Sequence, residues 1–212
     1  MNDIPSPDRL EDEEIREKAE AVRTEFNLTP DEIPVPVEEI IEVDLEIEPV
    51  LLPDLKSKYD IDGFLTKDFK QIYIDKNTYE NPRMIRRLRF TFAHELGHIY
   101  LHKHYVNEIE FKSEKEWIEF RSGISKISLS SYEYQANEFA GRFLVPKEKL
   151  IEELEKNRQD IDAFIKVAPH YNVDQLISYV SNNVCGDFNV SDGVISRRIK
   201  KERIWNEMNF GK

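Results

Sequence analysis

The pattern of apolar and polar positions predicts both helices and strands in the first eighty residues. An amphipathic helix is predicted near the start by apolar residues at helical spacing, namely Ile15, Ala19, Val22 and Phe26. After the prolines at positions 34 and 36, VEEIIEV is expected to form a short helix, and DLEIEPV alternates like a strand. Two β-rich runs in IDGFLTKDFKQIYIDKN flank Lys67–Phe69 and predict a hairpin, whose second strand is Gln71–Asp75.

The longest predicted helix follows Asn81 and Pro82, which suit a helix cap and a first turn. It covers PRMIRRLRFTFAHELGHIYLHKH, where apolar residues keep the helical period. Residues 105–130 are charged and contain serines, and their pattern predicts no element. The segment SYEYQANEFAGRFLVP predicts a second helix that ends near Pro146.

Shorter helices are predicted for the last third of the chain. They are Lys147–Glu155, Asp160–Val167, Val173–Asn183 with a capping pattern from Asn172 to Gln175, and a final helix after Ser191. There is no internal repeat and no long linker. We therefore expect one domain over 1–212, with an N-terminal helix and small sheet in 1–80, two central helices in 81–146 and a helical part in 147–212.

Composition narrows the class of protein. The chain has 212 residues, of which 40% are hydrophobic and 34% charged, and this is apolar enough for a folded core. Its net charge of −12 argues against general attraction to nucleic acid or anionic lipid. No secretory signal or membrane-spanning apolar run is visible, and the single cysteine, Cys185, excludes an internal disulfide or a multi-cysteine zinc site. A cytoplasmic protein without membrane contact is expected.

The central helix contains a metal-binding motif, HELGH, formed by residues 94–98. His94 and His98 are four residues apart, so both imidazoles lie on one helical face and can reach one ion. Zinc lowers the pKa of water towards 7, and Glu95 is placed to accept its proton as the water attacks a carbonyl. Such a motif arises by chance in roughly one chain in a hundred of this length, so a metal site is favoured over two surface histidines.

A third ligand is needed for a tetrahedral site. His102 lies further along the same straight helix and cannot converge on the ion, so it is expected either to contact a ligand histidine or simply to be packed. A carboxylate from the second helix is the remaining source, and Glu133 shares a face with Asn137, whereas Glu138 points away. Glu133 also completes an S-x-x-E pattern with Ser130, so spacing leaves a ligand and a helix cap equally open.

Two segments, RFTFAHELGHIYLH and EYQANEFAGRFLVP, resemble the ImmA/IrrE family of metallopeptidases, as does the C-terminal FNVSDGVISRRI. The resemblance implies an α+β fold with a small sheet packed on the HExxH helix, a thermolysin-like minimal core and a helical C-terminal part. It also implies that His94, His98 and Glu133 bind Zn²⁺, that Glu95 is the catalytic acid and base, and that Asn137 orients a ligand imidazole. The E-x-x-x-N pair is similar to the E-x-x-x-D of thermolysin-like gluzincins.

The expected function is therefore zinc-dependent endopeptidase activity. The resemblance implies a helix-turn-helix transcriptional repressor as the protein substrate, cleaved to derepress mobile-element, prophage or stress genes. The strand Gln71–Asp75 is expected to hold the substrate at the sheet edge. Oxyanion stabilisation is left open among four residues, Tyr132, Tyr134, His102 and His170.

The alternative is a DNA-binding or partner-binding regulator, including a toxin–antitoxin component, with a non-catalytic zinc site. It rests on a basic C-terminal segment that contains Arg197, Arg198, Lys200, Lys201 and Arg203. The turn before this segment resembles the one between the helices of DNA readers. The same pattern also fits an acidic partner protein or a solvated helix, and DNA is the less favoured partner.

Overall fold

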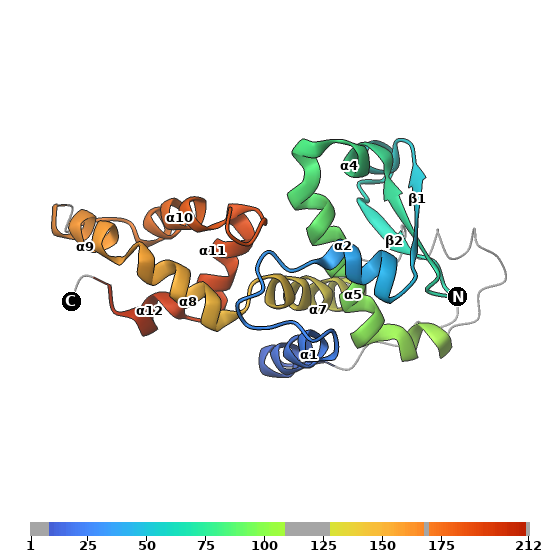
Figure 1. Cartoon of the computed structure of the whole chain (residues 1–212), viewed down its shortest axis with the longest axis horizontal. Coiled ribbons are helices and arrows are strands. Elements are labelled where there is room, and N and C mark those ends of the chain that lie inside the picture. The colour runs from blue at the N-terminus through green and yellow to red at the C-terminus, as the bar shows by residue number, and fades with distance from the viewer. Residues whose placement is uncertain (1–8, 109–127, 168–169, 211–212) are drawn as a thin grey trace.

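The computed structural model describes residues 9–108, 128–167 and 170–210 (Figure 1). It confirms the α+β prediction: a three-stranded sheet lies beside two central helices, and further helices gather at the other end of the molecule. The unassigned segment 105–130 lies largely outside the described residues. No described helix has the length and apolar character needed to cross a membrane.

The N-terminal helix α1, Asp12–Glu25, is confirmed, and it buries the predicted apolar face against α7. The expected short helix is also present, as α2, Val37–Glu39, which continues into a π-helical turn, η1, Ile40–Asp44. The sheet consists of β1, Glu48–Leu52, β2, Gly63–Leu65, and β3, Gln71–Asp75.

The strand order β1-β3-β2 corrects one expectation about substrate binding. β3 pairs with β1 in parallel and with β2 in antiparallel register, which confirms the hairpin. Because both sides of Gln71–Asp75 are already paired, this strand cannot add a substrate backbone to the sheet. β2 is the edge strand next to the central helices (Figure 1).

Two short helices were not predicted, α3, Leu55–Tyr59, and α4, Lys76–Glu80. Both depend on Asp75, which ends β3: its carboxylate accepts hydrogen bonds from the backbone N–H of Lys56 and from that of Thr78. A 3₁₀ turn, η2, Pro82–Met84, then leads into the long helix α5, Ile85–Glu108. Asn81 caps this turn as predicted by accepting from the N–H of Arg83.

Helix α5 packs closely against α7, Ser128–Leu144, because Gly97 faces Ala136. A Cβ atom on Gly97 would lie 3.1 Å from the Cα of Ala136 and 3.2 Å from its carbonyl oxygen. Glycine therefore permits an approach that a side chain would obstruct. This approach brings the first turns of α7 beside the histidines of α5.

The C-terminal helices are α8, Lys147–Lys156, α9, Arg158–Val167, α10, Val173–Val184, α11, Asp192–Lys201, and α12, Ile204–Met208. The first three match the predicted helices within two residues, and Asn172 caps α10 through the N–H of Gln175. The expected final helix is split, since Arg203 adopts φ 54° between α11 and α12. One apolar cluster extends from Ile15 in α1 to Phe210 after α12.

Candidate metal centre

The two histidines of the motif lie one turn apart on α5 and direct the same ring atom at each other. The Nε2 atoms of His94 and His98 are 3.0 Å apart, and the rings meet at 75°. His98 is buried and His94 is partly exposed. A pair of imidazole nitrogens at this distance can share one cation.

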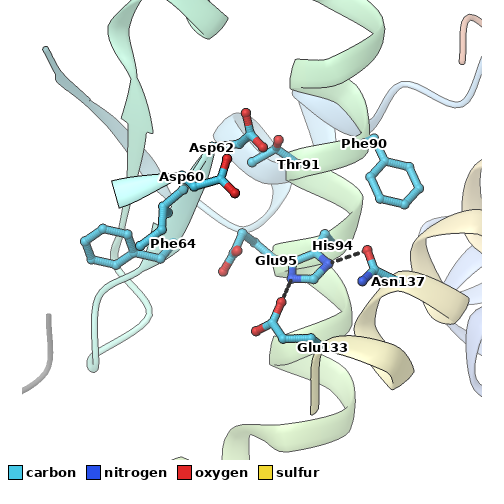
Figure 2. A pocket seen from close by; sticks show the side chains of 11 residues that line it. Asp60, Asp62, Phe64, Phe90, Thr91, His94, Glu95, Glu133 and Asn137 are labelled. Atoms are coloured by element: carbon cyan, nitrogen blue, oxygen red, sulfur yellow. Dashed lines mark hydrogen bonds and ion pairs between the residues drawn. The ribbon is translucent and has the colours of Figure 1, made fainter. Parts of the chain in front are cut away.

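Glu133 reaches the same point from α7 (Figure 2). Its Oε2 lies 3.0 Å from Nε2 of His94, and its Oε1 lies 3.4 Å from Nε2 of His98. The capping alternative is wrong, because α7 already begins at Ser128, two residues before Ser130. Glu133 is thus an internal helical residue whose carboxylate faces the histidines.

The spacing of these atoms fits zinc. Ligand atoms about 2.0–2.1 Å from a tetrahedral ion lie about 3.3 Å from one another. The contacts joining His94, His98 and Glu133 are 3.0–3.4 Å long, and two nitrogens with one carboxylate form a common catalytic zinc donor set. The three residues therefore fit the metal that the motif predicts.

The other nitrogen of each imidazole has its own partner. His94 Nδ1 lies 3.2 Å from Asn137 Oδ1 (Figure 2), and His98 Nδ1 lies 2.9 Å from His102 Nδ1. His102 Nε2 in turn lies 3.0 Å from Gln135 Oε1. Because the amide oxygens of Asn137 and Gln135 are acceptors, the N–H groups point away from the site, and each Nε2 keeps its lone pair for a metal.

Glu95 is buried between α5 and the sheet edge, and Figure 2 shows it directed towards β2. Its Oε2 accepts a hydrogen bond of 3.1 Å from the backbone N–H of Leu65. Ligand atoms of His94, Glu95 and His98 lie within 4.8 Å of one another. The carboxylate is therefore beside the point where the histidines meet, but it is held by the strand.

Glu138 has a different environment. It is buried one turn beyond the site, and its carboxylate pairs with Arg142 at 2.5 Å and with Arg197 at 2.6 Å. A buried carboxylate without a cationic partner would be strongly destabilising, and these two arginines compensate the charge of Glu138. This agrees with the prediction that Glu138 points away from the histidines.

None of the four residues considered for oxyanion stabilisation lines the cavity beside His94. Tyr134 donates to Asp12 at 2.7 Å and accepts from Lys201, and burial raises its pKa. His170 lines a separate pocket between α9 and α10. Tyr132 packs its ring edge-to-face against His102 behind the ligands.

The cavity beside the histidines has a volume of about 340 Å³. Beyond the predicted residues, its walls contain residues that the sequence did not single out, namely Asp60, Ile61, Asp62, Gly63, Phe64, Phe90 and Thr91. Phe90 and Thr91 lie four and three residues before His94, so helical spacing could have indicated them. The contribution of β2 depends on the tertiary fold and has no local signal.

Most charges of the basic C-terminal segment are already engaged. Arg198 is buried and pairs with Glu202 at 2.5 Å, while Arg197 pairs with Glu138. Lys200 pairs with Asp174 at 2.8 Å, and Lys201 donates to Tyr134. The segment therefore stabilises the contact between α11 and its neighbours.

The donor set on these two helices, two histidines and a carboxylate beside a second glutamate, is of the kind that metallopeptidases use. The chain matches the family model Peptidase_M78, described as the IrrE N-terminal-like domain, over residues 44–177. It belongs to this metallopeptidase family. The matched range contains the sheet, α5 and α7 and ends before α11. No curated protein matches the chain.

Proposed function

We propose that the protein is a zinc-dependent endopeptidase whose metal ligands are His94, His98 and Glu133. The observation that carries the proposal is the convergence of these three side chains within 3.0–3.4 Å beside a buried glutamate. Zinc bound there would acidify a water molecule and polarise the scissile carbonyl.

Glu95 is the proton carrier in this proposal. Its carboxylate takes the proton of the attacking water and later delivers a proton to the leaving amine. The N–H of Leu65 donates to Oε2 and so orients the carboxylate for this exchange. Asn137 and His102 act by holding the imidazoles of His94 and His98 in the required tautomer.

The edge strand β2 supplies a backbone surface for an extended substrate. The N–H of Asp75 donates to Asp62 and that of Thr66 donates to Gln71, so alternate residues of this segment face β3. Gly63 and Leu65 consequently direct their backbone groups away from β3, and Gly63 lines the cavity. A peptide paired with Gly63 would pass Glu95 and the histidines, as in recognition by strand addition.

The proposed substrate is a helix-turn-helix transcriptional repressor, and its cleavage would derepress mobile-element, prophage or stress genes. This part rests on the resemblance of the two zinc-site segments and on membership of the peptidase family. A repressor encoded beside the gene for this protein is the first substrate to test. A cytoplasmic location follows from this proposal, since the repressor acts there.

The decisive experiment compares the parent protein with Glu95→Gln. We expect the purified parent to hold one zinc and to cleave the neighbouring repressor or an internally quenched peptide mixture. Glu95→Gln should retain zinc while losing about 10² to 10⁴-fold in the cleavage rate, because the proton acceptor is removed and the ligands are kept. Glu148→Gln, which removes an exposed carboxylate from α8, is the matched control and should cleave normally.

Two results would overturn the proposal. One is cleavage by Glu95→Gln at the parental rate with zinc bound. The other is a repressor response in cells that Glu95→Gln preserves completely, which would favour the non-catalytic regulator in which zinc serves recognition alone.

A further inference from the structure

A second cavity, which we call the arginine groove, continues from the one at the metal centre. It has a volume of about 710 Å³ and shares Asp62, Phe90, Thr91 and Asn137 with the first cavity. Its walls are η2 and the start of α5, part of α7, and α11, which includes Gly193 and Val194. The groove is therefore a path that a polypeptide entering the metal centre can follow.

One face of α5 forms the floor of this path. Arg87 and Phe90 lie seven and four residues before His94, so all three side chains share one helical face. At 1.5 Å per residue, Arg87 lies about 10 Å along the axis from His94. An extended peptide covers that distance in about three to four residues.

The groove carries excess positive charge in an acidic protein. Its lining includes five arginines, Arg83, Arg86, Arg87, Arg197 and Arg198, against two carboxylates, Asp62 and Glu138. Three of the arginines have acidic partners: Arg87 binds Asp62 through two contacts of 2.5 and 2.9 Å, and Arg197 and Arg198 pair as described above.

Arg83 and Arg86 differ from the other three. Both are exposed, and within the part of the chain that the structure describes neither guanidinium has a carboxylate within 4.0 Å. Arg86 is held at the groove wall, where Nη1 donates to Sγ of Cys185 at 3.3 Å. Exposed guanidinium groups without a carboxylate partner are suited to bind a carboxylate of another molecule through paired hydrogen bonds.

We infer that Arg83 and Arg86 select substrates with an aspartate or glutamate about three to five residues from the scissile bond. This inference rests on the proposed endopeptidase function and specifies which substrates the enzyme prefers, namely those with an acidic residue at that distance. A peptide suits the groove better than a nucleic acid, because Asp62, Glu138 and the apolar Met84, Phe90 and Val194 also line it. A phosphate backbone would meet repulsion from both carboxylates.

The test uses a mixture of peptides with varied sequences, whose products are sequenced by mass spectrometry. We expect the parent to favour Asp or Glu three to five residues from the cut, on one side. In Arg83→Glu/Arg86→Glu the acidic preference should fall about tenfold or reverse towards Lys and Arg. A reversal is a result that loss of structure does not produce.

The matched control is Lys18→Glu/Lys166→Glu. These lysines are exposed on α1 and α9, lie outside the lining of both cavities, and give the same change of net charge. This control should keep the acidic preference. A parent without an acidic preference, or a preference that the two arginine substitutions leave unchanged, would overturn the inference while leaving the endopeptidase function intact.

A binding measurement decides the matter separately from hydrolysis. Zinc-loaded Glu95→Gln is titrated into three labelled probes: an alanine-glycine peptide with three glutamates, its lysine counterpart, and a 20-base-pair DNA duplex. We expect the acidic peptide to bind best and Arg83→Glu/Arg86→Glu to weaken it about tenfold at low salt. No difference between the two peptides, or DNA binding that depends on these arginines, would refute the inference.

Discussion

Nδ1 of His98 lies 2.9 Å from Nδ1 of His102, so the third histidine of α5 contacts the second on the side opposite to Nε2, the nitrogen that meets His94 and Glu133. His102 is 1% exposed and its Nε2 contacts Gln135. A chain of donors therefore runs from His98 through His102 to an amide on α7. This chain fixes the tautomer and orientation of His98, so in the proposed zinc site His102 would act on the metal through His98 without binding it.

Replacing His102 should weaken zinc binding without removing a ligand. We expect His102→Ala to lower zinc affinity by about 10 to 100-fold, because His98 loses the acceptor that holds its tautomer. Gln135→Ala should have a smaller effect of the same direction, since His102 then loses its own partner. Zinc titration with a competing chelator measures both, and an unchanged affinity in His102→Ala would mean that the histidine only packs.

Glu133→Gln is expected to damage zinc binding more than any change around the ligands. A neutral amide replaces a charged ligand oxygen, so affinity should fall by more than the 10 to 100-fold of His102→Ala. Asn137→Ala should have an intermediate effect, and Glu138→Gln the least. Because Glu138 is buried with Arg142 and Arg197, thermal unfolding of Glu138→Gln must be recorded alongside. Equal affinities for parent and Glu133→Gln would contradict the proposed ligand set.

Much of the site could be predicted from the sequence, because its residues are encoded in helical spacing. His94 and His98 are one turn apart, and Glu133 and Asn137 are one turn apart, so each pair needs only its own helix to share a face. That the two helices meet is a tertiary fact, which the family resemblance supplied and spacing did not. The fold class and most helices were predictable for the same local reason.

Features that depend on long-range contacts were missed or mistaken. The order β1-β3-β2 puts the expected substrate strand in the centre of the sheet, and only the pairing with β1 reveals this. Gln135 contacts His102 across two helices, and Leu65 binds Glu95 from a strand thirty residues away. The arginine groove joins α5 to α11, and no segment of either helix indicates it alone.

The stability of the protein should decrease in acid partly through Asp75. Burial alone would raise the pKa of this carboxyl, but hydrogen bonds from the N–H groups of Lys56 and Thr78 and from the Thr78 hydroxyl lower it below 3.8. Because the folded-state pKa is the lower one, its contribution is complete above the unfolded value. It is lost as pH falls through 3.8 towards the folded pKa.

Chemical unfolding between pH 6 and pH 3 measures this contribution. Asp75→Asn should lower the free energy of unfolding at pH 6 by about 1 to 3 kcal/mol, because α3 and α4 lose their shared acceptor. The variant should also lose less stability than the parent as the pH falls. Asp187→Asn, at an exposed position after α10, is the control. Parallel pH profiles for the parent and Asp75→Asn would contradict the assignment.

The close approach of α5 and α7 at Gly97 should link stability to metal binding. In Gly97→Ala, the new Cβ would lie 3.1–3.2 Å from backbone atoms of Ala136, and a packed helix cannot yield as a flexible side chain does. Gly193→Ala is the control, because it also replaces a helical glycine with alanine and its Cβ meets nothing nearer than 3.7 Å. We expect Gly97→Ala to be less stable than Gly193→Ala by about 1 to 3 kcal/mol in chemical unfolding.

Zinc affinity should fall in Gly97→Ala alone, because separating the helices moves Glu133 away from His94, which it now meets at 3.0 Å. Full stability with reduced zinc affinity, or the reverse, would show that helix spacing and metal geometry are independent.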